Sequence, residues 1–240
     1  MVSKNEIKLI TSLAQKKYRY KHLLFVAEGE KLVKDLLNSD YRLHRLYTTQ
    51  NQEFKTNKNL VELVSEKEMQ KISQLATPSS FLGVFYIPKT NKIISNGLQL
   101  VLEGIKDPGN LGTIIRLCDW FGVSQIVCSE DTVDCYNPKV VQATMGSFAG
   151  VTITYTNTEN YLKNSKLPKY FTLLEGRNIY EQKLPEEAII VMGNEANGIR
   201  TSLHELADYK ITIPQFGKDT KAESLNVAMA TAVVLSEFRK

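Results

Sequence analysis

Residues 103–120, EGIKDPGNLGTIIRLCDW, decide how the second half of the chain folds. They continue the apolar run LQLVLEG, which predicts a buried strand, and then pass through a turn rich in proline and glycine. We expect a helix to begin after Gly112, because one of its faces then carries the apolar side chains of Ile114, Leu117, Cys118 and Phe121. Gly122 is placed to end this helix.

Strands and helices alternate along the rest of the second half. The apolar runs QIVCSE, VTITYT, YFTLLEG, AIIVMG and KITIP predict strands, whereas PKVVQATMGSFAG and the segment from Ser224 onward predict helices. This alternation favours a mostly parallel sheet with helices on both faces. The first half predicts smaller α/β units, and the polar stretch PKTNKIISNG follows them. We therefore expect two domains, 1–90 and 98–240, joined by a linker at 91–97.

The composition is that of an ordinary globular protein, with 42% apolar and 23% charged residues. A net charge of +4 permits a nucleic-acid partner without requiring one. The three cysteines form no C-x-x-C pair and the three histidines form no cluster, so we expect neither a disulfide framework nor a metal site. No apolar run approaches the roughly 20 residues of a membrane span, and the start of the chain is too polar for a signal peptide. Because of both observations, we expect a soluble cytoplasmic protein without a membrane partner.

Ligands of a parallel α/β sheet bind where the carboxyl ends of strands meet loops and helix N-termini. At the first such junction Asn110 lies in the turn, and Arg116 points away from the apolar face of the helix at about 100° per residue. From the residues alone, two interpretations stay open. Arg116 is either a solvated surface residue with Asn110 as a turn former, or a group that faces a ligand.

The second junction is IIVMGNEANGIR, residues 189–200. A buried strand ends at Gly193, and two glycines in this stretch would let a ligand approach the main chain closely. The pattern is not G-x-G-x-x-G, and it lacks the Lys-Ser/Thr of a phosphate-binding loop, which argues against a Rossmann or nucleotide-hydrolase site. Glu195 either serves a ligand or only neutralises the N-terminus of a following helix.

The third junction is ITIPQFGKDTKAESLNVAMATAVVLSEF. Ser224 is predicted to cap the last helix, which is apolar almost all round. Asn226 is a polar residue within that run, and burying its amide without a partner would cost about 1–3 kcal/mol. Either a ligand or a facing loop would supply the partner.

Together the stretches NLGTIIRLCDWFG, GNEANGI and IPQFG with ESLNVAMA, in this order, resemble the SpoU/TrmH family of RNA 2′-O-ribose methyltransferases of the SPOUT superfamily. The resemblance covers residues 98–240. The first part of the chain is similar to the small α/β, ribosomal-protein-like domain of many members, on the pieces FVAEGEKLVKDLL and TPSSFLGVFYIP.

The resemblance implies a C-terminal trefoil knot, a homodimer with active sites at the subunit interface, and S-adenosyl-L-methionine as the cofactor. Carried over to matching positions, the cofactor would be bound by Leu174, Gly193, Asn194, Ile213, Gln215, Leu225 and Asn226. The catalytic set would be Arg116 with Asn110, Glu195, Ser224 and Asn226.

The role of Arg116 within that set follows from its chemistry. A guanidinium has a pKa above about 12 and is a poor base. We therefore expect Arg116 to stabilise the developing alkoxide and to hold the adjacent phosphate, and the general base stays open. Glu195 would orient Arg116 or the ribose.

The RNA-facing signal of the first domain is the stretch QKKYRYKHLLF. Its basic residues would contact phosphates while its tyrosines stack on unpaired bases. The predicted RNA-binding residues are Lys16, Lys17, Arg19 and Lys21. The alternative is a solvated helix end.

Three functions remain open at this point. Methylation of ribosomal RNA is favoured because the accessory domain is ribosomal-protein-like, and transfer RNA is the second choice of substrate. The rival from another class is a non-catalytic RNA-binding or ribosome-assembly protein that keeps the fold. The presence of Arg116, Glu195, Ser224 and Asn226 favours the enzyme.

Overall fold

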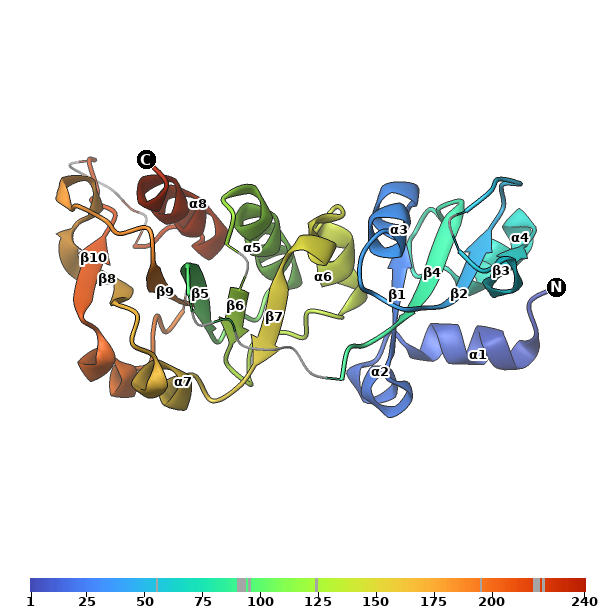
Figure 1. The fold of residues 1–240 in the computed structure, drawn as a ribbon, viewed down its shortest axis with the longest axis horizontal. Coiled ribbons are helices and arrows are strands. Elements are labelled where there is room, and N and C mark those ends of the chain that lie inside the picture. Colours follow the sequence, from blue (N-terminus) through green and yellow to red (C-terminus); the bar gives the residue numbers. More distant parts are fainter. Residues whose placement is uncertain are drawn as a thin grey trace. The chain divides into compact units, whose positions relative to one another are not determined.

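The computed structural model describes residues 1–240 except for Lys55, residues 90–93, Ser95, Ser124, Glu195, residues 218–220 and Ala222. The chain divides into two compact units (Figure 1). The first unit holds residues 1–90 and 134–149, and the second unit holds residues 91–133 and 150–240. Most of the expected linker at 91–97 lies outside the described residues.

The second unit is built on a six-stranded sheet in the order β10-β8-β9-β5-β6-β7. Each neighbouring pair of strands is parallel, which confirms the prediction of a parallel sheet. The strands are β5 (Leu98–Glu103), β6 (Gln125–Cys128), β7 (Thr152–Tyr155), β8 (Lys169–Asn178), β9 (Ala188–Gly193) and β10 (Tyr209–Thr212). Because the strands are parallel, their carboxyl ends meet at one edge of the sheet.

Helices cover both faces of this sheet. Figure 1 shows α5 (Pro108–Trp120) and α8 (Val227–Phe238) side by side on one face and α7 (Thr158–Asn164) on the other. Two short 3-10 helices, η3 (Ile179–Glu181) and η4 (Thr201–Leu206), follow β8 and β9.

Helix α5 begins earlier than the sequence predicted. Pro108 is its first residue, and the side chain of Asp107 caps it by accepting from the Asn110 N–H at 2.8 Å. The glycines at 109 and 112 suggested a turn, but Gly112 is buried within the helix and joins the packed face with Leu111 and Ile115. Gly122 follows the helix in the left-handed region, with φ of +66°, as predicted.

The cap of α8 is Asn226 and not Ser224, so that prediction was wrong. The Oδ1 atom of Asn226 accepts from the N–H groups of Ala228 at 3.0 Å and Met229 at 3.3 Å. Both residues are good caps by type, and the helix starts at Val227, directly after the asparagine.

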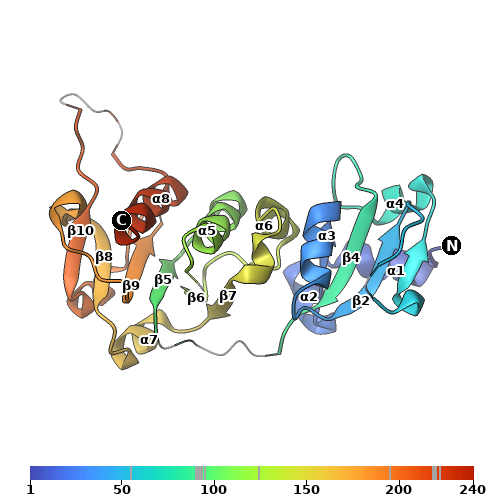
Figure 2. The same cartoon turned by 45° about the horizontal axis from the view of Figure 1, so that its top comes forward.

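The first unit contains a four-stranded sheet in the order β1-β4-β2-β3. Figure 2 shows its two middle strands, β4 and β2, side by side. β1 (Leu24–Glu28) and β2 (Leu43–Thr48) run antiparallel to β4 (Phe81–Tyr86), and β2 runs parallel to β3 (Val61–Leu63). Its helices are α1 (Lys4–Ser12), α2 (Lys16–His22), α3 (Glu30–Leu37), η1 (Lys58–Leu60), α4 (Glu66–Ile72) and α6 (Pro138–Ala143), and η2 (Ser147–Gly150) follows α6.

Residues 134–149 belong to the second half of the sequence but pack on the first unit. Phe25 of β1 contacts the rings of Tyr136 and Phe148, with centroid distances of 5.0 and 5.8 Å. Asp134 accepts from the Nε and Nη2 atoms of Arg19 at 2.9 and 2.6 Å, and both side chains are almost completely buried. This segment is therefore part of the core of the first unit.

Arg19 does not fit its predicted role in RNA binding. Its Nη1 atom donates to the carbonyl oxygens of Leu13 and Ala14 at 2.9 Å, so the whole guanidinium is used inside the unit. The basic stretch predicted RNA contacts for every cation in it, but α2 turns this one toward the core. The predicted neighbours Lys16, Lys17 and Lys21 are exposed.

Replacing Arg19 with alanine leaves the Asp134 carboxylate buried and unpaired. We expect Arg19→Ala to lower the free energy of unfolding of the first unit by about 3–5 kcal/mol, measured by urea denaturation. Lys17→Ala on the same helix is the matched control, because an exposed lysine contributes within about 0.5 kcal/mol. Equal stability of the two variants would contradict this structural role.

Candidate active site

A cleft of about 640 Å³ opens in the second unit beside the carboxyl ends of β9 and β10. Its walls come from segments that are far apart in the sequence: the middle of β8, the loop after β9, the end of β10, and the residues that lead into α8. The large apolar side chains of Leu174 and Leu225 line it and are 77% and 51% exposed. The cleft therefore offers apolar surface to a ligand, and polar side chains such as Asn194 and Ser224 lie beside that surface.

The cleft brings together most of the predicted cofactor-binding residues. Its lining includes Leu174, Gly193, Asn194, Ile213 and Leu225, and also Ser224 of the predicted catalytic set. Gln215 is exposed and is not among the lining residues, and neither is Asn226. Glu195 lies outside the described residues.

The loop after β9 is folded tightly upon itself. The Oδ1 atom of Asn194 accepts from the N–H groups of Ala196 at 3.0 Å and Asn197 at 2.7 Å. A Cβ atom on Gly193 would lie 2.1 Å from the carbonyl carbon of Gly198, so glycine is required where these two backbone segments touch. The next helical element after the loop is η4, a 3-10 helix. The loop therefore presents its main chain to the cleft.

Asn226 joins the cleft to α5. Its Nδ2 atom donates to the Oδ1 atom of Asn110 at 2.9 Å, while its own Oδ1 atom caps α8. The hydrogen-bond partner that the sequence required for the Asn226 amide is thus a side chain of the facing helix α5. The Asn226 side chain is exposed, although the sequence suggested that it is buried. Because Ser224 and Leu225 precede it, this amide ties one wall of the cleft to the first turn of α5.

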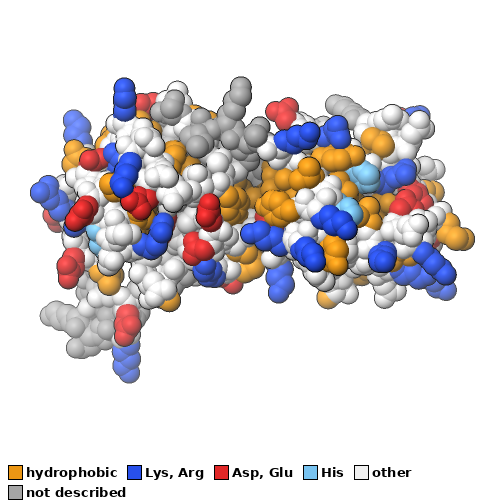
Figure 3. Space-filling view, turned by 90° about the horizontal axis from the view of Figure 1, so that it is seen from below, with side chains coloured by type: hydrophobic (Ala, Val, Ile, Leu, Met, Phe, Trp, Pro, Cys, Tyr) orange, Lys and Arg blue, Asp and Glu red, His pale blue; other side chains and the backbone are white. Residues whose placement is uncertain are grey.

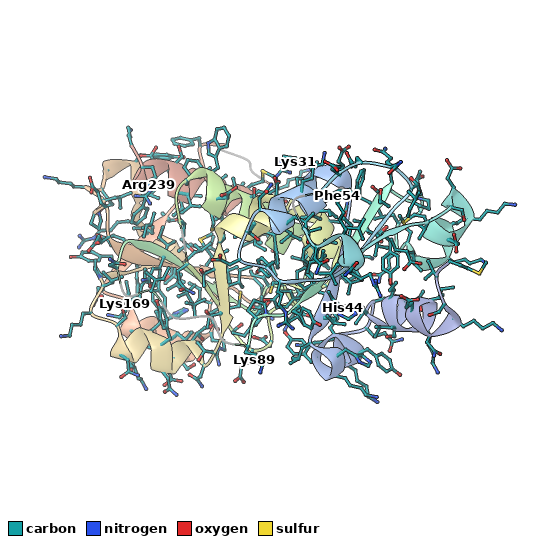
Figure 4. The ribbon with its side chains drawn as sticks, turned by 45° about the vertical axis from the view of Figure 1, so that its right-hand side comes forward. Lys31, His44, Phe54, Lys89, Lys169 and Arg239 are labelled. Carbon is teal, nitrogen blue, oxygen red and sulfur yellow. The ribbon has the colours of Figure 1, made fainter. Side chains whose placement is uncertain are left out.

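A second link fastens the opposite end of the same two helices. Arg239, labelled in Figure 4, follows α8 and donates from Nε to the Phe121 carbonyl at 2.8 Å and from Nη2 to the Gly122 carbonyl at 3.0 Å. These carbonyls lie at the C-terminus of α5, where a cation is favourable. The orientation of α5 relative to the cleft is therefore fixed at both ends.

Arg116 lies on the exposed side of α5. It is not among the residues that line the cleft, and it forms no ion pair with another described residue. The structure thus links Asn110 of α5 to Asn226, which directly follows the cleft residues Ser224 and Leu225, and it places Arg116 on the exposed side of the same helix.

Two family models match the chain. A model described as the SpoU rRNA methylase family matches residues 97–236. The chain belongs to this family. A model described as an MRM3-like substrate-binding domain matches residues 4–83, within the first unit.

Named relatives of this SpoU family member act on ribosomal RNA. It is 29% identical to the 23S rRNA (guanosine(2553)-2′-O)-methyltransferase RlmP of Bacillus subtilis, over 95% of this chain and 93% of that protein. It is 35% identical to the 23S rRNA (guanosine-2′-O-)-methyltransferase RlmB of Neisseria meningitidis, over 60% of this chain and 58% of that protein.

Solved structures share the fold over the whole chain. A TrmH-family protein from Porphyromonas gingivalis is 38% identical, with a TM-score of 0.93 over 100% of this chain and 98% of that one. An AdoMet-bound rRNA methyltransferase from Sinorhizobium meliloti is 31% identical, with a TM-score of 0.89 over 100% of this chain and 96% of that one.

An ion pair between a buried carboxylate and a half-exposed guanidinium, beside the cleft of this SpoU family member, was missed by the sequence patterns. Glu103 ends β5 with its side chain 3% exposed, and Arg200 donates from Nε to its Oε2 atom at 2.7 Å. The hydroxyl of Thr158 donates to the same carboxylate and accepts from Arg200 Nη2 at 3.1 Å. The carboxylate raises the pKa of Arg200. This pair anchors the end of the loop after β9 to the central strand of the sheet, across 97 positions of sequence.

Potential metal ligands do not gather in the described part of the chain, where no cluster of three or more such side chains occurs. Among the same residues, no helix is long and apolar enough to cross a membrane. The three cysteines are buried, and burial raises the pKa of the Cys118 and Cys128 thiols.

Proposed function

We propose that this protein is an S-adenosyl-L-methionine-dependent RNA 2′-O-ribose methyltransferase and that its substrate is ribosomal RNA. The observation that carries the proposal is the cleft in which Leu174, Gly193 and Leu225, from three separate segments of the chain, meet. The names of RlmP and RlmB as 23S rRNA 2′-O-methyltransferases support the reaction and the RNA class. The S. meliloti structure, named as AdoMet-bound, supports the cofactor.

The residues of the cleft fit S-adenosyl-L-methionine. A volume of about 640 Å³ lies within the range of small-molecule sites, which is about 300–1,000 Å³. Leu174 and Leu225 keep large apolar surfaces in water, and a bound adenine ring would cover them favourably. Gly198 has open space where a side chain would stand, so the cofactor can approach the main chain of the loop after β9 there.

The protein's own residues position and stabilise the reacting RNA. When bound, the cofactor supplies a methyl group carried on a sulfonium. The Arg116 guanidinium stabilises negative charge that develops on the ribose 2′ oxygen and holds the adjacent phosphate. Asn110 and Asn226 hold α5, and therefore Arg116, in a fixed orientation. Glu195 orients Arg116 or the ribose, and Ser224 completes the site from the cleft wall.

A homodimer completes the proposed site. Trp120 of α5 and Met229 of α8 are 84% and 58% exposed, and these two helices pack against each other. Large apolar side chains on adjacent helices favour self-association. A second copy on this face would bring the exposed Arg116 of one protomer to the cleft of the other.

The C-terminal trefoil knot expected of the family is also part of the proposal. It rests on membership of the SpoU family, whose model matches residues 97–236, and on the TrmH-family structure that shares the fold over 100% of this chain.

Residues 1–90 of the first unit would form the domain that binds the RNA substrate. Lys16, Lys17 and Lys21 are exposed on α2. Lysine and arginine side chains gather on the face of this unit drawn in Figure 3.

We place the protein in the cytoplasm, where its buried thiols stay reduced and ribosomal RNA is accessible.

Removing the Arg116 guanidinium separates binding from catalysis. We expect Arg116→Ala to bind S-adenosyl-L-methionine as tightly as the natural protein in calorimetry, and to lose about 100-fold or more in methyl transfer to ribosomal RNA. Arg116→Lys keeps the charge without the planar fork and should retain part of the rate. Wild-type protein that binds no cofactor would instead support a non-catalytic RNA-binding role.

The lysines of α2 can be tested independently of the cofactor. We expect Lys16→Ala with Lys17→Ala to weaken RNA binding and to flatten its dependence on salt, because fewer phosphate contacts release fewer counterions. Cofactor affinity should not change. A lysine outside α2, Lys183→Ala, is the control. RNA binding that is unchanged in the double variant would reject α2 as a contact.

A further inference from the structure

A second cavity, of about 330 Å³, lies in the first unit between β1, the segment that follows α4, and α6. Val26, Leu75, Pro138 and Ala143 form its apolar walls, and the exposed Lys139 stands at its rim. One carboxylate, that of Glu28, is the acidic group among its lining residues. All of the lining residues belong to the first unit.

Glu28 is the last residue of β1 and only 4% exposed. Its Oε2 atom accepts from the Ser73 hydroxyl at 2.5 Å, and its Oε1 atom accepts from the Gln74 N–H at 2.7 Å. Each oxygen of a carboxylate can accept about two hydrogen bonds. Each Glu28 oxygen therefore has one further acceptor position that the Ser73 and Gln74 donors do not use. Burial raises the pKa of Glu28, which indicates that two donors do not fully compensate the charge.

The wall opposite Glu28 is held firmly in place. α6 belongs to the segment 134–149, which the buried ion pair of Arg19 with Asp134 fastens to the first unit. The rings of Phe25, Tyr136 and Phe148 pack around the same segment. A preformed cavity binds a ligand without first having to order its walls.

We propose that this cavity receives an unpaired guanine base of the RNA substrate, with the Glu28 carboxylate accepting from its N1–H and N2–H groups. Guanine is the RNA base with two adjacent N–H donors on its Watson–Crick edge, the edge by which unpaired bases are read. The other bases place an acceptor beside each donor, which would face the carboxylate unfavourably. The inference rests on the proposed function for RNA as the partner.

The size and lining of the cavity agree with a single base. Its volume is at the lower limit of ligand sites, which is about 300 Å³, and this suits a planar ring rather than a whole nucleotide. Val26, Leu75 and Pro138 offer apolar contacts to the faces of the ring. Lys139 at the rim can contact the phosphate that follows.

Base preference tests the proposal directly. Fluorescence anisotropy with the full chain would compare short oligouridines that carry one central guanosine, inosine or adenosine. We expect the guanosine oligomer to bind about tenfold more tightly than the adenosine oligomer, because a bidentate base contact provides this degree of discrimination, and the inosine oligomer to bind with intermediate affinity. Inosine lacks only the N2 amino group, so it isolates one of the two hydrogen bonds.

Glu28→Gln keeps the size of the side chain but removes its charge, and it should abolish the preference. Glu30→Gln is the matched control, because Glu30 is 52% exposed and pairs with Lys34. Ala143→Leu fills the cavity from α6 and should abolish the preference without touching the carboxylate. Thermal unfolding checks that each variant is folded.

Three results would overturn the proposal. The natural protein could bind all the oligomers equally, or the preference for guanosine could survive both Glu28→Gln and Ala143→Leu. Guanosine 5′-monophosphate, at the same concentration as the oligomer, could also displace the guanosine oligomer completely. The last would assign the cavity to a free nucleotide. Calorimetry with S-adenosyl-L-methionine on the same samples keeps the two proposals apart. Cofactor binding without base preference rejects only the guanine site, and base preference without cofactor binding rejects only the methyltransferase.

Discussion

The hydrogen bond between Asn226 and Asn110 is the contact on which the architecture of the candidate site depends. One side-chain amide serves two helices, because its oxygen begins α8 and its nitrogen holds the first turn of α5. Arg239 closes the same pair of helices at the other end. Helices that are fixed at both ends cannot rotate independently, so the exposed face of α5 keeps one orientation relative to the cleft.

The first unit depends on a different long-range contact. A buried ion pair costs more than it returns unless further hydrogen bonds satisfy its charges. Arg19 meets this condition, since it donates to the carbonyls of Leu13 and Ala14 as well as to Asp134. The segment 134–149 thereby becomes part of a unit whose other residues lie at the start of the chain. One insertion between β6 and β7 thus serves the core of the other unit.

Sequence periodicity predicted what depends on neighbouring residues. The apolar runs located the strands of the second unit, and the family resemblance indicated residues such as Leu174 and Leu225 that the fold does bring into one cleft. Helix boundaries were harder to predict, because one residue type can serve in a turn, as a cap or within a helix. The glycines before Ile114 suggested a turn inside what is α5, and Ser224 competed with Asn226 as a cap.

Contacts between distant positions could not be predicted in the same way. The burial of Arg19 depends on Asp134, 115 positions away, and the pairing of Glu103 with Arg200 spans 97 positions. In both cases the sequence shows only a charged residue, which is most often solvated. Such pairs become visible only when the fold brings the two elements together.

The central claim is that the cleft and α5 act together on a ribose hydroxyl. Incubating the protein with ribosomal RNA and labelled S-adenosyl-L-methionine, followed by digestion to nucleosides and mass spectrometry, tests it most directly. We expect the label to appear on the 2′ oxygen of a single kind of nucleoside. Label on a base, or no transfer by protein that binds the cofactor, would contradict it.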